Sequence, residues 1–560
     1  MSKINIGALG GLGEDGKNMY FVEVDDQIFV LDAGQKYPSL SLHGIDGIVP
    51  NMSYLVENKS KVKAILLSHG HDEAIGGLPA LLREIKVPVY GSPFTIAIVE
   101  QLLREKKVNT RDLELNKITD DKILRFGKVS ITFYNQTHSL PGSLGIAIHT
   151  LDGAIVYATD FSFTTLNNKN YQTSFDKLSV LKNEGVLAVL SESIGTDSVD
   201  RVSSDYNLNG IVNQALVKPG RVVFAMLAPE LQRIQKVIDL CIAHNRRIGF
   251  VGRKAQRILS VGIDTGYLKV PEESIVPLKF ITPEDANDAD DMVIIIAGTK
   301  HEPYYMLQRM CRGQDKLVQL TDQDKVIIIA PVVPGIEKLA ATTTDVLSRY
   351  HVDYKEIKKN QLVSSHADGV DLEMLYTILN PKYIFPIAGE FRHQYRQKEI
   401  AKSFGYDEAM IKILENGSIY HLVDGQTPAK GAFERIKTGE VYIDGTTIGE
   451  VDKNLLEDRN TLATDGIVIV ETVISEIAQK ILITPRIEYR GFLSMENRED
   501  LDDDIINVVL NNINALFAGK YLDLDDLKKT LRSLVAQKVY EKTGKMPLVM
   551  VIILDNNGRI

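Results

Sequence analysis

The sequence contains no tryptophan and only two cysteines among its 560 residues. Cys241 and Cys311 lie far apart and neither belongs to a CxxC pair, which argues against a disulfide framework or a thiolate zinc site. Any bound metal must therefore be held by histidine and carboxylate side chains. The lack of tryptophan also removes one of the aromatic surfaces on which nucleic-acid bases stack.

Long apolar runs are absent too, since no stretch reaches the roughly 18 apolar residues of a membrane-spanning helix. Residues 1–7 lack a charged and then apolar leader. We therefore expect a cytoplasmic protein with no membrane partner. The net charge of −10 argues against nonspecific coating of nucleic acid, although an acidic total is compatible with a local basic channel.

The length exceeds what one hydrophobic core normally serves, so about three domains are expected. Residues 4–9 and 19–24 are typical of short alternating strands with tight turns. From about residue 205, continuous apolar strands such as 293–298 alternate with amphipathic helices, which favours a parallel α/β domain. The first pattern resumes after residue 364, with a strand over 383–387, and this indicates an insertion within the first domain.

A final unit follows a polar connector near residues 438–458. It combines a strand over 467–470, an acidic helix over about 498–516, a second helix near 524–541 and a strand over 548–554. This order predicts a small α/β domain. Taken alone, the acidic helix would be a solvated face.

Two histidines mark the most informative motif. His69 and His71 follow the apolar run 63–67 and precede a predicted helix over 75–84. Imidazoles at positions i and i+2 leave a strand end on the same side and can converge on one cation. A His-x-His pair alone is most often unliganded, but His138 and Asp160 also stand at predicted strand ends, where a sheet sandwich exposes its ligands.

Several motifs together resemble the ribonuclease J family, which combines metallo-β-lactamase and β-CASP nuclease domains. The motifs are residues 10–19, 68–71, 135–141, 159–161, 364–369 and 386–392. Within that family the chain is most similar to the second, partly degenerate paralogue of Gram-positive bacteria. The resemblance implies an α/β fold, a metallo-β-lactamase αββα sandwich with an inserted β-CASP α/β domain and a small α/β C-terminal domain.

The resemblance also predicts where these parts lie. The metallo-β-lactamase domain is expected over residues 1–204 and 365–445, the β-CASP domain over 205–364, a linker over 446–460 and a C-terminal dimerisation domain over 461–560.

Carried over by position, the family's first metal would be held by His69, His71, His138 and a bridging Asp160, a donor set that suits Zn²⁺ or Mn²⁺. The second metal would use Glu73 and the shared Asp160. It would also need histidines where Ala74 and Ala388 stand. Two of its protein ligands are therefore missing, and we expect one metal site at most.

Other residues match the family's catalytic and substrate-binding positions. Asp160, Glu192 and His366 match catalytic residues. Glu192 matches a carboxylate that could orient a metal-ligating histidine. His366 matches a group that stabilises the scissile phosphate or protonates the leaving oxygen. Ser364 and Ser365 match phosphate-binding residues. Without the resemblance, Glu192 would be a strand-end carboxylate, His366 a capping-loop histidine and the serine pair a helix N-cap.

Asp32 and a cluster of basic residues can each be interpreted in two ways. Asp32 matches a carboxylate that supports the ligand loop, or is a plain turn residue. Arg253 matches a substrate-binding residue at the end of a β-CASP strand. It belongs to a basic cluster that is either a nucleic-acid groove or a solvated face, formed by Arg246, Arg247, Arg253, Lys254 and Arg257.

The resemblance thus implies a ribonuclease of RNA processing and decay, a 5′-to-3′ exonuclease with some endonuclease activity. Its catalysis should be weak or conditional, because a two-metal hydrolase uses both ions to activate water and to clamp the reacting oxygens. Its expected partners are RNA, an active ribonuclease J paralogue, a homodimer or heterotetramer, and an RNA-degradation complex. One alternative is a largely noncatalytic RNA-binding scaffold subunit, and another is a small-molecule hydrolase of the lactamase fold.

Overall fold

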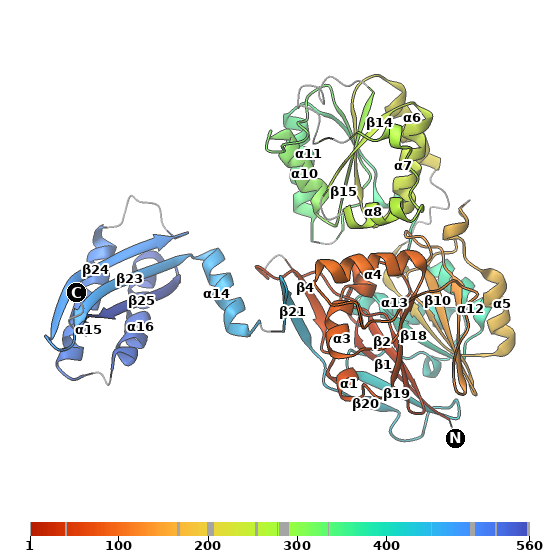
Figure 1. Ribbon diagram of the computed structural model, residues 1–560, viewed down its shortest axis with the longest axis horizontal. Coiled ribbons are helices and arrows are strands. Elements are labelled where there is room, and N and C mark those ends of the chain that lie inside the picture. The colour runs from red at the N-terminus through yellow and green to blue at the C-terminus, as the bar shows by residue number, and fades with distance from the viewer. Residues whose placement is uncertain are drawn as a thin grey trace. The chain divides into compact units, whose positions relative to one another are not determined.

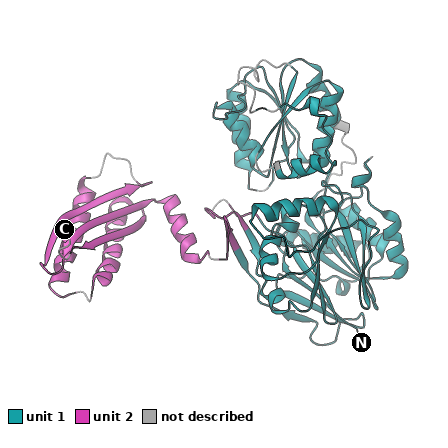
Figure 2. Cartoon of the chain, viewed as in Figure 1, with its two compact units in different colours: residues 1–36, 48–441 teal, residues 37–47, 442–560 magenta. Residues whose placement is uncertain are grey.

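The computed structural model describes residues 2–39, 42–164, 168–198, 206–252, 256–276, 278, 291–333, 335–449, 451–492, 499–520 and 523–556. The chain forms two compact units, one of residues 1–36 and 48–441 and the other of residues 37–47 and 442–560 (Figure 2). Among the described helices, none combines the length and the apolar character that crossing a membrane requires.

Two large sheets form the centre of the first unit. The first sheet has the order β20-β19-β1-β2-β3-β5-β6-β7. Its strands are β1 (Lys3–Gly10), β2 (Met19–Val24), β3 (Gln27–Leu31), β5 (Val62–Leu66), β6 (Val89–Gly91), β7 (Leu115–Lys117), β19 (Ser418–Val423) and β20 (Phe433–Arg435). The second sheet, β18-β12-β11-β10-β9-β8, contains β8 (Leu124–Phe126), β9 (Val129–Asn135), β10 (Leu144–Thr150), β11 (Gly153–Ala158), β12 (Val186–Glu192) and β18 (Tyr383–Ile387).

The two sheets pack face to face, with helices outside them. Apolar side chains from both sheets, such as Val22 and Phe133, form one core between them. A second core joins the outer face of the second sheet to α5 (Phe175–Glu184), α12 (Gly369–Leu379) and α13 (Phe391–Ser403). Strands such as β2 and β12 are buried on both faces for this reason. This is the expected αββα sandwich.

The predicted helix over 75–84 is wrong in one respect, because it is divided into α2 (Asp72–Ile75) and α3 (Leu78–Glu84). Gly76 and Gly77 lie at the break, where the chain passes close to residues 33–35. A Cβ on Gly77 would lie 2.6 Å from the carbonyl oxygen of Gly34. The break therefore allows the ligand loop to pack directly on the turn after β3.

The chain leaves the sandwich after β12 and returns with α12 and then β18, which pairs in parallel with β12. The inserted part contains the parallel sheet β14-β15-β13-β16-β17, covered on both faces by helices (Figure 1). The strands are β13 (Val222–Leu227), β14 (Arg247–Val251), β15 (Met292–Gly298), β16 (Lys325–Ile328) and β17 (Asp353–Glu356). The helices are α6 (Tyr206–Val217), α7 (Leu231–Ala243), α8 (Gln256–Asp264), α10 (Glu302–Cys311) and α11 (Glu337–Arg349). The predicted insertion of a parallel α/β fold is thus confirmed.

The second unit holds the sheet β24-β23-β25, formed by β23 (Ile467–Ser475), β24 (Lys480–Arg490) and β25 (Leu548–Asp555). One face packs on α15 (Glu499–Phe517) and α16 (Leu524–Thr543). Sequence patterns predicted neither β24 nor α14 (Lys453–Thr464), and α14 occupies much of the predicted linker.

Candidate metal and nuclease site

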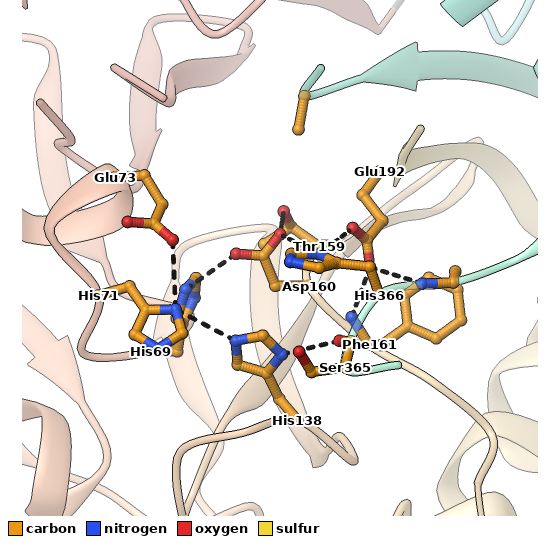
Figure 3. Close-up of polar contacts among 12 residues, drawn as sticks. His69, His71, Glu73, His138, Thr159, Asp160, Phe161, Glu192, Ser365 and His366 are labelled. Atoms are coloured by element: carbon orange, nitrogen blue, oxygen red, sulfur yellow. Dashed lines mark hydrogen bonds and ion pairs between the residues drawn. The ribbon is translucent and has the colours of Figure 1, made fainter. Parts of the chain in front are cut away.

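Four polar side chains converge where strands of the sandwich end. His69 and His71 follow β5, His138 follows β9, and Asp160 follows β11. All four are buried, and each offers a ligand atom within 4.8 Å of the others (Figure 3). The structure therefore brings together the predicted ligand set of the first metal.

Hydrogen bonding defines which ring nitrogen of His69 faces this cluster. The hydroxyl group of Ser68 donates its proton to Asp32 Oδ2 over 2.7 Å. The hydroxyl oxygen of Ser68 lies 2.8 Å from His69 Nδ1 and, having given its own proton to Asp32, must accept from it, so Nδ1 carries a proton. Nε2 of His69 consequently faces Asp160 Oδ2 at 2.9 Å; burial lowers the pKa of His69, but the Asp160 carboxylate outweighs it and raises that pKa above its ordinary value.

The other two imidazoles are held in the same way. His138 donates from Nδ1 to the carbonyl oxygen of Ser365 over 2.9 Å, which turns Nε2 toward the cluster. His71 directs Nε2 to the carbonyl oxygen of Pro229 at 3.4 Å and turns Nδ1 to the cluster, 3.2 Å from His138 Nε2. Partners on the outer nitrogens of ligand histidines fix the tautomer that binds a metal.

These donors fit a divalent cation. His69 Nε2 and Asp160 Oδ2 are buried 2.9 Å apart, and neither has a hydrogen-bond partner in the described part of the chain. Burial alone would raise the pKa of Asp160, but His69 and the neighbouring histidines hold it far below its ordinary value, so the group is a carboxylate. Burial and the adjacent histidines keep the pKa of His138 well below its ordinary value, which favours the neutral form that ligates metal. Three imidazoles and one carboxylate suit Zn²⁺, and also Mn²⁺.

The expected second metal position is poorer in donors. Glu73 Oε1 lies 3.2 Å from His71 Nδ1 at the rim of the cluster, but Glu73 joins no compact ligand group among the described residues. The His71 imidazole outweighs burial and lowers the pKa of Glu73 to about 2. Ala74 and Ala388 are fully buried and offer no donor atom on their side chains. The residues present do not fit a second ion held by four protein groups.

Glu192 and His366 form a second polar group beside Asp160. Glu192 Oε2 lies 2.7 Å from His366 Nδ1, while Oε1 accepts from the backbone N–H groups of Phe161 and Ala367. Burial lowers the pKa of His366, but the carboxylates of Glu192 and Asp160 outweigh it and raise that pKa to about 10. Among the described contacts, Glu192 thus orients His366 rather than one of the three clustered histidines.

The serine pair does not cap a helix, so that alternative is wrong. Asp368 is the N-cap of α12 and accepts from the N–H of Asp371 over 2.9 Å. Ser364 instead closes a turn, with its hydroxyl bonded to the backbone carbonyl and N–H of His366. Ser365 contributes the backbone carbonyl that binds His138.

Asp32 is more than a turn residue. Its carboxylate is fully buried and accepts from the N–H and hydroxyl of Ser68 and from the hydroxyl of Tyr157, each over 2.7 Å. Burial raises its pKa to about 6.

Two supporting groups of the site were not predicted from the sequence. Ser68 stands directly before His69, and that position was a usable signal. The carbonyl of Pro229 has no sequence signal.

The basic cluster is largely engaged within the protein. Arg246 is buried and donates to backbone carbonyls of residues 216–220, and Arg247 pairs with Asp291. Arg257 pairs with Asp72. Arg253 and Lys254 lie outside the described residues. The described arginines therefore do not form an open nucleic-acid groove.

Comparison with known families covers nearly the whole chain. The metallo-beta-lactamase superfamily matches residues 12–188, and the ribonuclease J beta-CASP domain matches residues 219–347. A Zn-dependent metallo-hydrolase RNA specificity domain matches residues 349–411, and the ribonuclease J C-terminal domain matches residues 454–556.

Individual relatives give the same result. The chain is 33% identical to "Ribonuclease J 2" of Streptococcus pyogenes serotype M3, over 99% of this chain and 100% of the relative. It is 31% identical to "Ribonuclease J 2" of Staphylococcus aureus strain NCTC 8325, over 99% and 98%. A crystal structure of a protein of unknown function from Enterococcus faecalis V583 shares the fold, with a TM-score of 0.53, 15% identity and coverage of 75% of this chain and all of that one. Full-length similarity and the matched order of four domains show that the chain belongs to the ribonuclease J family.

Proposed function

We propose that this protein is a weak or conditional metal-dependent ribonuclease that acts on RNA in the cytoplasm, during RNA processing and decay. Its primary mode would be 5′-to-3′ exonuclease activity, with some endonuclease activity. The observation that carries the proposal is the convergence of three histidine ring nitrogens and the Asp160 carboxylate next to the Glu192–His366 pair.

His69, His71, His138 and Asp160 would hold one Zn²⁺ or Mn²⁺. Such an ion supplies Lewis acidity toward a phosphodiester and activates water when it is bound. The protein groups around it supply orientation, because each outer histidine nitrogen already has a partner. We assign Glu73 the role of an auxiliary carboxylate at the rim.

His366 would act on the substrate. Glu192 holds the Nδ1–H of His366, which leaves the Nε2–H free to donate to a phosphoryl oxygen or to protonate the leaving oxygen. Ser364 and Ser365 would bind the phosphate. Ser364 also fixes the turn that carries His366, because its hydroxyl is bonded to the backbone of that residue. We retain Arg253 as a further phosphate contact on the basis of the family resemblance.

Weak activity follows from the two alanines. A two-metal hydrolase clamps both the attacking and the leaving oxygen, and Ala74 and Ala388 supply no donors for a second ion. The same observation favours an alternative function, a largely noncatalytic RNA-binding subunit that acts through an active paralogue.

The second unit would provide the contact with another chain. The sheet face opposite α15 and α16 exposes Met550, Ile552 and Leu554 on β25, and Ile483 lies across β23 from them, on β24. Exposed contiguous apolar side chains of this kind mark interaction surfaces. We propose that this face pairs with a second copy or with an active ribonuclease J paralogue, as a homodimer or a heterotetramer within an RNA-degradation complex.

The test is decay of 5′-monophosphorylated RNA by metal-stripped protein resupplied with Zn²⁺, Mn²⁺ or Mg²⁺. The control is a His69→Ala, His71→Ala double variant, which reports contaminating nucleases. Decay that the double variant loses would support the ribonuclease. RNA binding without decay in any metal would overturn it and support the scaffold subunit.

A further inference from the structure

The inserted part of the chain touches the ligand loop of the candidate metal site directly. Arg257, on α8, donates from Nη2 to Asp72 Oδ1 over 2.7 Å, although 185 residues separate the two. Asp72 stands between His71 and Glu73 and begins α2. This ion pair thus joins the insertion to the segment that carries two predicted metal ligands.

The pair is sheltered from solvent. The side chains of Arg257 and Asp72 are only 15% and 16% exposed, so solvent screens them less than a surface pair. Arg257 Nη1 also lies 3.4 Å from Glu105 on α4 (Pro93–Glu105), a carboxylate that is 49% exposed. The guanidinium group therefore has one inner and one outer carboxylate partner, and the inner one is closer.

Other contacts also join the insertion to the sandwich. The rings of Phe94 on α4 and Tyr267 in the insertion lie 5.4 Å apart, edge to face. The N–H of Gln232 donates to the carbonyl oxygen of Ser139, the residue after His138, over 3.2 Å. The carbonyl oxygen of Pro229 faces His71 Nε2. The insertion consequently contacts both loops that carry the clustered histidines.

Backbone hydrogen bonds of Asp72 also hold the ligand loop in place. Its carbonyl oxygen accepts from the N–H of Gln35 over 2.9 Å and from the N–H of Gly76 over 2.8 Å. The backbone directly after His71 is thus fixed by the turn after β3, and the Asp72 side chain is fixed by α8. Fixing this loop keeps His71 Nδ1 directed at the cluster.

We propose that Arg257 is a positioning residue for the metal site, which holds the His71 loop through Asp72 and thereby sets metal affinity. The inference rests on the proposed metal-dependent function and deepens it. Partners outside the ligand shell typically change metal affinity by about 10- to 100-fold when they are removed. An Arg257→Lys variant should retain part of the effect, because lysine keeps the charge but not the planar fork.

The experiment measures Zn²⁺ affinity of the full chain by competition with a chromophoric chelator. Arg257→Gln and Asp72→Asn should each weaken Zn²⁺ binding by about 10- to 100-fold. The double variant should be no weaker than the worse single variant, because both changes remove the same ion pair. Glu105→Gln should stay within about threefold of the unsubstituted protein, since its carboxylate is the outer partner.

A matched control separates positioning from general destabilisation. Arg221 and Asp324 form an ion pair of the same 2.7 Å length deep in the insertion, with both side chains 3% exposed. Arg221→Gln should lower the unfolding temperature and leave the Zn²⁺ affinity of the folded protein unchanged. An Arg257→Gln protein that folds and binds Zn²⁺ as tightly as the unsubstituted chain would overturn the proposal, as would additive losses in the double variant.

The readout also separates this proposal from the ribonuclease activity. Loss of Zn²⁺ affinity in Arg257→Gln, in a protein that cleaves no RNA in any metal, would support positioning and refute the ribonuclease. RNA decay together with unchanged Zn²⁺ affinity in Arg257→Gln would support the ribonuclease and refute positioning by Arg257.

Discussion

Glu192 lies 2.7 Å from His366 through a carboxylate oxygen and the Nδ1 atom, although 174 residues separate them in the chain. The other oxygen of Glu192 accepts from two backbone N–H groups, those of Phe161 and Ala367. One buried carboxylate therefore ties the strand end of the sandwich to the loop that follows the insertion.

Replacing Glu192 with glutamine should separate substrate chemistry from metal binding. The amide can present only one oxygen, so its N–H₂ group must face a donor, either His366 or the backbone. We expect a loss of about 1–3 kcal/mol in the free energy of unfolding. RNA decay should fall by about 10²-fold or more. Equilibrium denaturation, decay assays and metal analysis check this, and a variant that loses its metal but not its stability would contradict it.

Restoring the missing donors should raise activity. The double variant Ala74→His, Ala388→His is expected to increase bound metal from one to two ions per chain and RNA decay on the order of 10²-fold. Ala388 has a positive φ of 47°, which histidine tolerates better than most residues.

Elemental analysis and decay assays on the same preparations measure both effects. The control is Ala74→Asn, Ala388→Asn, since asparagine also accepts a positive φ but lacks an imidazole. Equal metal content and activity in the two double variants would contradict the assignment of these positions.

Glu14 should give the fold an acid-sensitive contribution. It forms ion pairs with Lys17 at 3.1 Å and Lys36 at 3.0 Å and accepts from Asn416 over 2.7 Å. Burial raises its pKa, but the two lysines outweigh this, and the pKa is lowered from the model-peptide value of 4.5. A lowered pKa stabilises the fold above pH 4.5, and this contribution is lost as the pH falls through the folded-state pKa.

Glu14→Gln should therefore cost about 1–3 kcal/mol of unfolding free energy at neutral pH and progressively less below pH 4.5. Denaturant titrations between pH 3 and 7 measure this difference. Glu57 is exposed, so its substitution by glutamine serves as the control. This substitution should leave the unfolding free energy unchanged at both neutral and acidic pH. A difference that stayed constant down to pH 3 would rule out the ionic contribution.

A charge on the open sheet face should dissociate the assembly. Ile552 is 36% exposed between Met550 and Leu554 on β25. Ile552→Glu would bury an unpaired carboxylate in the proposed interface and should weaken association by at least about tenfold. Analytical ultracentrifugation of the chain, alone and with an active paralogue, detects the change. Asn511→Glu on α15 adds the same charge elsewhere and should leave association intact. Unchanged association of Ile552→Glu would place the interface on another surface.

Sequence patterns predicted long buried strands such as β1, β2, β15 and β18, because their apolar residues recur regularly. β24 escaped prediction since Pro485 interrupts it, at a point where the pairing with β23 is irregular. Helix α14 escaped because none of its residues is buried, so it has no apolar stripe to detect.

The candidate site divides in a similar way. The family resemblance, carried by motifs at strand ends, predicted that His69, His138 and Asp160 would meet. Their supporting contacts were not predictable, because the carbonyl oxygens of Pro229 and Ser365 leave no mark in the residue types. The Arg257–Asp72 pair was hidden for the same reason, since the basic cluster alone does not reveal which carboxylates it meets.

The partner of His138 also carries a consequence for how the protein is made. Ser365 follows His138 by 227 residues in the chain. A nascent polypeptide that has already released all three clustered histidines and Asp160 from the ribosome still lacks the carbonyl that fixes one imidazole. Synthesis must pass the whole insertion before the metal cluster is complete, so a chain truncated within the insertion cannot form the site described here.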